Sequence, residues 1–256
     1  MSELEHLYRD YHAELNRQKF IESDLDYTVF EKHRPFLERL AQVNNSGVTV
    51  FDLFKKQHIF TSYNFTELFG HDMMAIQEYG NEYFNSRVHP HDMIALLQHA
   101  IIILRFYYQL EQCERLNYKF ITEYRILGGD NKYIRVIEQH QALETDRHGN
   151  VWLALGIIDI SPDQSALSGI KTQLFNYKTG RAVAVGTNND LERKLSKREL
   201  EVLQYVKDGL LSKEISEKLF ISVHTVNTHR QRILEKLGVS NSIEAISFAA
   251  RFGLLK

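Results

Sequence analysis

Cysteine and histidine are the side chains of this chain most suited to metal binding or nucleophilic chemistry, but their spacing forms no recognisable site. The single cysteine, Cys113, has no partner for an internal disulfide and excludes a structural metal site built on cysteines. His89 and His91 flank a proline, which favours the start of a helix. Gly128 and Gly129 indicate a turn, and neither a phosphate-binding glycine loop nor a nucleophile elbow occurs. The sequence therefore predicts no metal site and no enzyme.

Residues suited to recognition rather than catalysis gather near the end of the chain, where we expect four helices. Ser196 and Glu199 have the spacing of a capping box, which starts the first helix. Ser212 and Ser222 are expected to cap the second and third helices, and Gly238 to precede the fourth. Two short helices of which the second has a polar outer face predict a helix-turn-helix, whose second helix enters the major groove of DNA. The residues expected to face the core are Leu200, Leu203, Val206, Ile215, Leu219, Val226, Ile233, Leu237, Ile243, Ile246 and Ala249.

Four phrases of this region resemble, in order, the LuxR-type (GerE-like) DNA-binding domain. They are LSKRELEVLQYVKDG, SKEISEKLFIS, HTVNTHRQRILEKLGV and SIEAISFAARFGLL. The resemblance covers residues 194–254, and we place the DNA-binding domain at residues 192–256. It implies a bacterial transcription factor that binds double-stranded DNA.

The resemblance also implies which residues touch DNA. Asn227 departs from the lysine that is common in the family, and because Asn and Gln can pair bidentately with adenine, we expect A·T pairs where Asn227 and Gln231 bind. The family pairs through its fourth helix, so we expect a homodimer that pairs around Ser242 to Ala249 and reads two half-sites; Ser242 departs from the usual arginine. The expected base-contacting residues are Asn227, Thr228 and Gln231, and the expected phosphate-contacting residues are Lys213, Thr225, His229, Arg230 and Arg232.

Residues 44–162 are expected to form a separate domain with an antiparallel sheet. The runs VTVFDLF and HIFTSYN predict a hairpin, residues 64–86 broken helices, and residues 93–109 a long helix capped by Asp92. Alternating runs within residues 119–160 predict a meander of three strands. This order, with the phrases VHPHD, YRILGGDNKYIRV and DRHGNVWLALGIIDIS, resembles a PAS domain. The expected fold class is α+β: a PAS-like antiparallel sheet domain with flanking helices, followed by an all-α four-helix LuxR-type helix-turn-helix domain.

Two further segments flank the PAS-like domain. Residues 1–43 are an N-terminal helical segment, whose second helix is expected at residues 30–43 with Pro35 in its first turn. Residues 163–191 are a linker that could form a small hairpin turning at residues 178–180.

The composition of the chain limits the kinds of partner that the protein can have and its location in the cell. The DNA-binding segment has 12 Lys and Arg against 8 Asp and Glu, a charge of +4 that favours a phosphate-facing surface, whereas the rest of the chain carries −6. No apolar run is long enough to cross a membrane, and the polar start does not resemble a secretion signal. We therefore expect a cytoplasmic protein without a membrane partner, and name RNA polymerase as a candidate partner.

The PAS resemblance leaves the signal open, because PAS domains bind small molecules, flavin, haem or nothing. Haem-binding relatives use a histidine of the long helix, where His99 lies, although a structural histidine is the better expectation. Cys113 lies outside the helix that a flavin photosensor needs, and Trp152 is the only tryptophan where the class that senses acyl-homoserine lactones uses several. The antiparallel pattern opposes a phospho-receiver domain. We predict no cofactor and an unknown ligand, with a pure protein-interaction module as the alternative.

Overall fold

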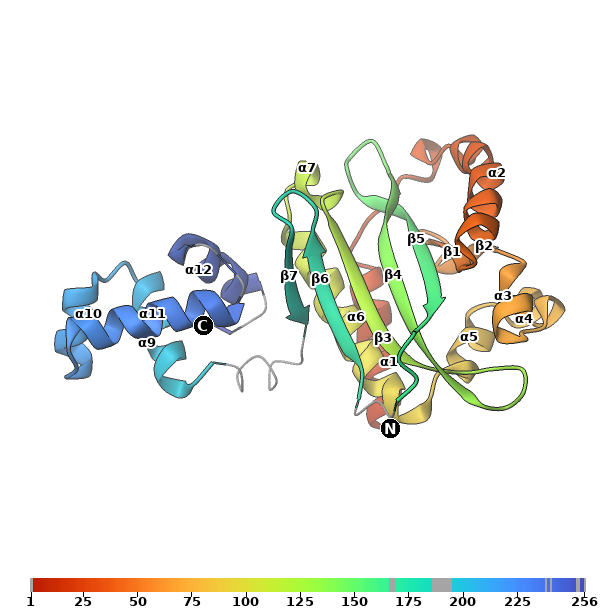
Figure 1. Ribbon diagram of the computed structural model, residues 1–256. Coiled ribbons are helices and arrows are strands. Elements are labelled where there is room, and N and C mark those ends of the chain that lie inside the picture. The colour runs from red at the N-terminus through yellow and green to blue at the C-terminus, as the bar shows by residue number, and fades with distance from the viewer. Residues whose placement is uncertain are drawn as a thin grey trace. The chain divides into compact units, whose positions relative to one another are not determined.

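The computed structural model describes residues 2–165, 169–185, 195–237, 239, 241–251 and 254–255. The chain divides into two compact units, Met1–Lys178 and Thr179–Lys256 (Figure 1). Residues 186–194, where we predicted the end of the linker and the start of the DNA-binding domain, lie outside the described residues, as does Gly238. Within the described part of the chain, no helix is both long and apolar enough to cross a membrane.

The first unit begins with helical elements that precede its sheet. The first helix starts at a capping box in which Ser2 and Glu5 bond each other's backbone N–H groups. Asp26 caps the next long helix by accepting from the backbone of Thr28. Because this cap starts the helix at Tyr27, Pro35 lies in the helix interior, and our expectation of a first-turn proline was wrong. The elements are α1 (Glu3–Leu15), the 3-10 helix η1 (Glu22–Asp24) and α2 (Tyr27–Asn44).

One antiparallel sheet with the strand order β2-β1-β5-β4-β3-β6-β7 forms the centre of the fold. The expected hairpin pairs β1 with β2, and the expected meander pairs β3 with β4 and β4 with β5, so both predictions are confirmed. β6 pairs with β3, so part of the expected linker extends the sheet and covers a strand edge that would otherwise be unpaired. The strands are β1 (Gly47–Asp52), β2 (Gln57–Thr61), β3 (Tyr118–Leu127), β4 (Tyr133–Thr145), β5 (Val151–Ile160), β6 (Lys171–Asn176) and β7 (Arg181–Val185).

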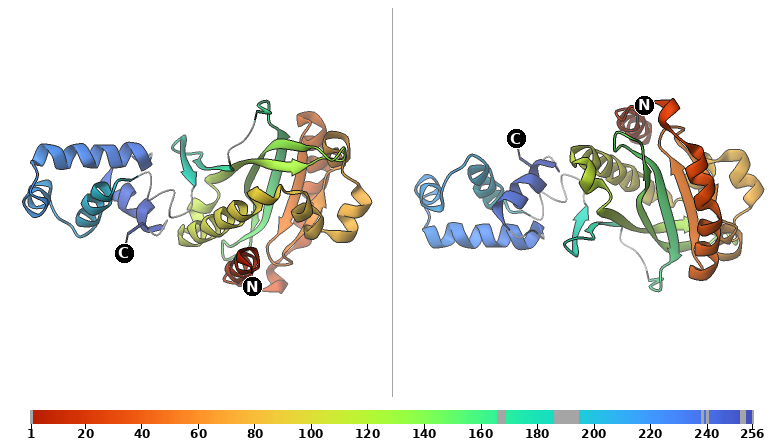
Figure 2. Two further views of the ribbon diagram at one scale, coloured as in Figure 1. Left: turned by 90° about the horizontal axis from the view of Figure 1, so that it is seen from below. Right: turned by 90° about the horizontal axis from the view of Figure 1, so that it is seen from above.

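Helices cover both faces of the sheet (Figure 2). Alternate residues of a strand point to opposite faces. Leu153 and Leu155 of β5 share a buried cluster with Leu37 of α2, whereas Ala154 and Gly156 face the side covered by α6 and α1. The helices between β2 and β3 are α3 (Asn64–Phe69), α4 (Met73–Tyr79), α5 (Asn81–Arg87), α6 (Pro90–Gln109) and α7 (Gln112–Arg115). This order of strands and helices is the PAS-like order predicted from the sequence.

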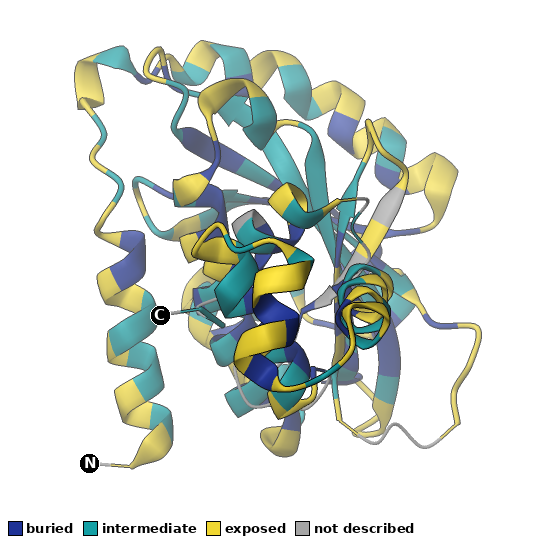
Figure 3. Ribbon diagram, turned by 90° about the vertical axis from the view of Figure 1, so that its left-hand side faces the viewer, coloured by how far each residue is buried: buried dark blue, intermediate teal, exposed yellow. Residues whose placement is uncertain are grey.

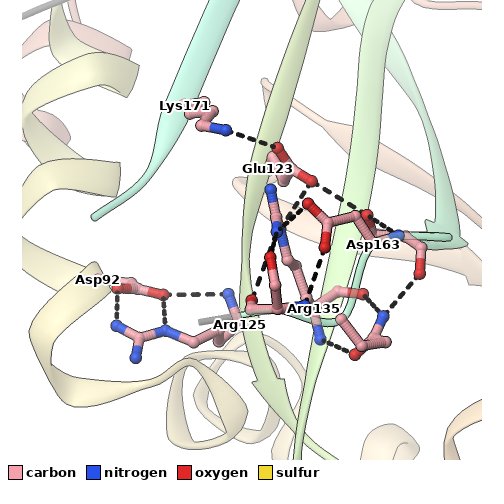
Figure 4. A network of polar contacts seen from close by, with 9 residues as sticks. Asp92, Glu123, Arg125, Arg135, Asp163 and Lys171 are labelled. Carbon is pink, nitrogen blue, oxygen red and sulfur yellow. Dashed lines mark hydrogen bonds and ion pairs between the residues drawn. The ribbon is translucent and has the colours of Figure 1, made fainter. Parts of the chain in front are cut away.

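The start of α6 differs from the prediction. His89 is the N-cap, where its Nδ1 accepts from the backbone N–H of His91, and the proline between them occupies the first helical turn. Asp92, the expected cap, is fully buried and binds Arg125 of β3 (Figure 4). Its Oδ1 lies 2.6 Å from Nη2 of Arg125, and its Oδ2 accepts from Nε and from the backbone N–H, both at 3.0 Å. The carboxylate therefore ties α6 to the sheet instead of capping it.

A second charged network holds the end of β5 (Figure 4). Arg135 of β4 is 5% exposed, and its Nη1 donates to Oδ2 of Asp163 at 2.9 Å. Its Nε lies 2.8 Å from Oε1 of Glu123, without the alignment of a hydrogen bond. Lys171 of β6 approaches the other oxygen of Glu123 at 3.9 Å. The network thus joins β3, β4, β6 and the residues after β5.

The second unit contains four described helices around an apolar core, as predicted. Its buried residues lie on one side of each helix, and exposed residues line the outer turns (Figure 3). Ile243 was expected to face inward but is 80% exposed, because Ala245, Phe248 and Ala249 supply the buried face of the last helix. The helices are α9 (Lys197–Lys207), α10 (Ser212–Leu219), α11 (Val223–Leu237) and α12 (Ser242–Arg251).

Candidate nucleic-acid interface and interior cavity

α10 and α11 meet at a tight corner that sets the direction of α11. Phe220 adopts a left-handed conformation with φ 54° and is 95% exposed. Ser222 then caps α11, because its Oγ accepts from the backbone N–H of Thr225 at 3.0 Å, as the sequence predicted. Ser212 does not cap α10. It is the first helical residue, and Glu214 instead accepts from the backbone N–H of Leu211, the N-cap, at 2.7 Å.

α11 has one buried and one exposed stripe. The inward residues Val226, Ile233 and Leu237 are at most 2% exposed, so the predicted core is confirmed. Asn227 and Gln231 are exposed and lie one helical turn apart, on the other side of the helix. The structure therefore places two of the expected base-contacting residues along one solvent-facing stripe, with the half-buried Thr228 next to Asn227.

Two residues of that stripe already have partners within α11. The hydroxyl of Thr228, which is half-buried, donates to the carbonyl of His224 at 3.0 Å. The amide of Gln231 donates to Oε1 of Glu235 at 3.3 Å. Both are surface contacts along a single helix, and a long polar side chain such as Gln231 can exchange such a contact for a base edge.

The expected phosphate-contacting residues differ in their exposure to solvent and in their contacts within the protein. Lys213 of α10 and Arg232 of α11 are exposed. Thr225 is half-buried, and its hydroxyl lies 2.8 Å from that of Ser222. His229 is half-buried, and its Nδ1 is enclosed without a hydrogen-bond partner among the described residues.

Arg230 is held by two serines and links three helices. Its Nη1 donates to Oγ of Ser212 at the start of α10 at 2.9 Å. Its Nη2 donates to Oγ of Ser242 at the start of α12 at 3.0 Å. Asn227, Arg230, Gln231 and Ser242 share the wall of a surface hollow of about 540 Å³. Arg230 therefore positions α11 as well as lying beside its polar stripe.

A buried carboxylate anchors α11 to the first helix of the unit. Glu199 is 2% exposed, and it accepts from the backbone N–H of Ser196 at 2.6 Å and from Nζ of Lys236 at 2.7 Å. Burial opposes its ionisation, but the bonds from Lys236 and Ser196 prevail and lower its pKa. The capping box predicted at residues 196–199 is confirmed and also fixes the end of α11.

The first unit contains a partly open cavity of about 230 Å³ between α6 and the sheet. A second cavity of about 160 Å³ shares His58, Phe120 and His140 with it. Burial lowers the pKa of His58 to about 4, although the hydrogen bond that its Nδ1 donates to Oδ1 of Asn81 opposes the shift. Sequence reasoning missed this site because its residues come from separate helices and strands.

Strand β4 supplies one polar edge of the larger cavity. Glu138 and His140 alternate along β4 and so share a face, and Oε1 of Glu138 lies 3.2 Å from Nε2 of His140. Tyr124 of β3 donates to Oε2 of Glu138 at 2.9 Å, and burial raises the pKa of this tyrosine well above its usual value. The run EQHQ is polar at every position, so no alternation in it indicates which pair faces inward.

His99 lines the same cavity from α6. It is 6% exposed, and its Nδ1 lies 2.9 Å from the hydroxyl of Thr172 in β6, which in turn lies 3.2 Å from that of Thr122 in β3. A cavity of about 150 Å³ holds one benzene ring, so a cavity of about 230 Å³ does not fit the four-ring macrocycle of haem. Among the described residues, no three His, Cys, Asp or Glu side chains are grouped to hold a metal ion.

Comparison with known proteins identifies the family of the second unit. The model of the family "Bacterial regulatory proteins, luxR family" matches residues 193–249. The oxygen regulatory protein NreC of Staphylococcus carnosus is 33% identical over 114 residues, which are 39% of this chain and 52% of NreC. The chain therefore matches about half of the length of that relative.

Two solved structures align with the chain, one over about a quarter of it and the other over most of it. The transcription factor GerE is 38% identical over 25% of this chain and 94% of its own length, with a TM-score of 0.24. The phage protein VqmA, solved in complex with DPO, aligns over 91% of this chain and 92% of its own, at 17% identity and a TM-score of 0.31. Identity at that level says nothing of a shared ligand.

Proposed function

We propose that this chain, whose residues 193–249 are a DNA-binding domain of the LuxR family of bacterial regulatory proteins, is a transcriptional regulator that recognises specific double-stranded DNA through α11. The exposed polar stripe with Asn227 and Gln231, opposite the buried stripe with Val226 and Ile233, carries the proposal. A helix that is held by its apolar side and offers amide groups on the other is suited to the major groove. Bacterial DNA lies in the cytoplasm, which is therefore the proposed location.

The proposed contacts divide by chemistry. Asn227, Thr228 and Gln231 would read base edges, with A·T pairs at the steps that Asn227 and Gln231 contact. Phosphate contacts from cationic and hydroxyl side chains would fix the register without reading sequence. These contacts are assigned to Lys213, Thr225, His229, Arg230 and Arg232.

A single module makes few DNA contacts, so we expect the chain to act as a homodimer on two half-sites. α12 presents Ile243, an aliphatic side chain that is 80% exposed, beside the half-buried Ser242 and Ile246. Pairing is proposed there because the family resemblance assigns it to the fourth helix, to whose surface Ile243 adds an apolar side chain. RNA polymerase is a candidate further partner of such a regulator.

The first unit is proposed to sense a small molecule that alters DNA binding by the second. The two cavities between α6 and the sheet favour this role. The alternative, a domain that only pairs with another protein, is favoured by exposed apolar side chains on α2 and near β2, namely Phe36, Val43 and Tyr63. A native mass spectrum of the purified chain separates them, because only a sensor domain would carry or accept a small molecule.

The decisive experiment for DNA recognition selects binding sites from random double-stranded DNA. We expect the wild type to enrich a site with A·T pairs, and Asn227→Ala and Gln231→Ala each to lose preference at one position, by about 1–3 kcal/mol of discrimination. Lys207→Ala, an exposed change on α9 outside the assigned set, is the matched control and should enrich the wild-type site. Unchanged preference in both helix variants would refute recognition through this stripe.

A further inference from the structure

Resting on the proposed recognition of DNA through α11, we infer that His224 is a further base-reading residue, which donates a ring N–H to the major-groove edge of a guanine. The family resemblance assigns base contacts only to Asn227, Thr228 and Gln231, which lie further along the helix. The exposure of His224, its position around the helix and the chemistry of its ring support this additional contact.

The ring of His224 is available for an external partner. His224 lies in the first turn of α11 and is exposed to solvent. Its backbone carbonyl accepts from the hydroxyl of Thr228 at 3.0 Å, whereas its ring makes no hydrogen bond or ion pair among the residues that the structure describes. The amide of Gln231, in contrast, already donates to Glu235. An exposed donor without such a contact can bind a base edge without first giving up a bond within the protein.

Helical geometry places His224 on the side of α11 that is proposed to read bases. Each residue of a helix turns by about 100°, so His224 and Gln231, seven residues apart, differ in direction by only about 20°. Asn227 lies about 60° from His224 by the same geometry. The core residues Val226 and Ile233, which are at most 2% exposed, lie on the opposite side. His224, Asn227 and Gln231 therefore share one outward-facing side.

The spacing of these three residues also matches the spacing of base pairs. His224 and Gln231 are about 10.5 Å apart along the helix axis at 1.5 Å per residue. Three steps between base pairs cover about 10 Å. Zinc-finger helices read three successive bases with residues at a similar spacing. His224 should therefore read the base pair next to that of Asn227, on the side away from that of Gln231.

The first half of α11 is the half suited to approach DNA. Recognition helices contact base edges with their N-terminal residues, and His224 precedes the other two residues in the chain. Glu235 lies one turn beyond Gln231 on the same side and is exposed. Its carboxylate would be repelled by DNA phosphates. This charge disfavours contact through the second half of the helix and so favours contact through the half that carries His224.

A histidine N–H is best matched by guanine. Histidine carries an N–H in either charge state, so it can always donate. In the major groove a guanine offers two acceptors, N7 and O6, and no donor. An adenine places an amino donor beside N7, a cytosine offers only its amino group, and a thymine has one acceptor beside its methyl group. His224 therefore favours a G·C pair, whereas the amides of Asn227 and Gln231 favour A·T pairs.

The test uses the full-length wild type and the DNA site that it enriches from random sequence. We expect a G·C pair next to the A·T pair that Asn227 reads. Replacing this G·C pair by A·T should weaken wild-type binding about fivefold, which is the effect of one ordinary hydrogen bond. A wild type that binds the two DNA sites equally would overturn the inference, and this comparison does not depend on whether any variant folds.

Variants then assign the contact. His224→Ala retains the carbonyl that binds Thr228 and should bind the two DNA sites equally, whereas His224→Gln should prefer adenine at this position. His6→Ala, the same change at an exposed site of the first unit, should retain the preference for guanine. Retained preference in His224→Ala would overturn the inference. Equally weakened binding of His224→Ala to all sequences would overturn it too, because a phosphate contact has that effect.

Failure of this inference can be told from failure of the proposed function. If Asn227→Ala loses preference at its position but His224→Ala keeps every preference of the wild type, only the role of His224 is refuted. If the wild type enriches no sequence at all, the proposed function is refuted and the role of His224 with it.

Discussion

The two units differ in where their candidate recognition groups lie: those of the second unit are exposed to solvent, and those of the first line its interior. α11 turns amide groups such as those of Asn227 and Gln231 toward solvent, from a helix whose other side is buried. In the first unit His71, Glu138 and His140 line an interior cavity. An outward stripe can be inferred from helical periodicity in one segment, whereas an inward cavity is assembled from segments that only the fold brings together.

The largest expected effect is on the free energy of unfolding, and it tests whether the two units have separate cores. Ile233→Ala removes a side chain that is 2% exposed in α11 and should destabilise the second unit by about 2–5 kcal/mol. Urea unfolding followed by helical circular dichroism should show the shift. Fluorescence of Trp152, which is buried in the first unit, should show none.

Val43→Ala, on the exposed surface of α2, is the control and should change neither probe by more than about 0.5 kcal/mol. A shift of the Trp152 transition in Ile233→Ala would mean that the two cores unfold together, and the contrast between independent units would fail.

The second largest expected effect is a dependence of the stability of the first unit on pH, which would follow from a histidine buried in that unit. Burial lowers the pKa of His58 from 6.5 to about 4, so the unfolded chain takes up a proton more readily than the folded one between these values. The first unit should therefore lose stability as pH falls from 6.5 toward 4, by at most about 3 kcal/mol from this residue. Unfolding free energies from Trp152 fluorescence at pH 7 and pH 5 measure the loss.

His58→Gln should reduce that pH dependence, while His6→Gln, at an exposed site, should retain it. An identical loss of stability in the wild type and His58→Gln would show that other groups are responsible.

The smallest expected effect is on DNA affinity, and it concerns only the exposed surface of the second unit. Lys213 is exposed on α10 and is assigned to a phosphate, so Lys213→Ala should weaken binding to all DNA sequences by less than tenfold. The slope of log affinity against log salt should fall by about 1, because one fewer counterion is released. Affinity measured from low to moderate salt tests this, and an altered sequence preference would instead assign Lys213 to a base.

The sequence predicted the order of elements because strand alternation and helical periodicity are local signals. It predicted the inward positions of α11 for the same reason. It misplaced Asp92 as a cap because its role depends on Arg125 in a distant strand. It placed Ile243 inward because spacing alone does not tell which face of α12 meets the core, and Ala245 and Ala249 allow the closer approach.

The candidate sites were predictable to different degrees. The polar stripe of α11 followed from a resemblance that covers one continuous segment. The cavity could not be predicted, because the sequence alone does not show whether a histidine is enclosed or exposed to solvent. His71 and His140 become informative only when the fold removes solvent from one ring nitrogen and leaves it unpaired.

The guanidinium of Arg230 holds the start of α12, and it is also one of the groups proposed to contact a DNA phosphate. Nη1 and Nη2 are bonded to Ser212 and Ser242, so a phosphate that recruits this side chain competes with one or both serines. If pairing depends on how α12 is seated, the free energy of pairing and that of DNA binding must then influence each other equally in both directions. The affinity for DNA and the strength of the dimer would then change together, and a substitution of Ser242 would alter DNA binding.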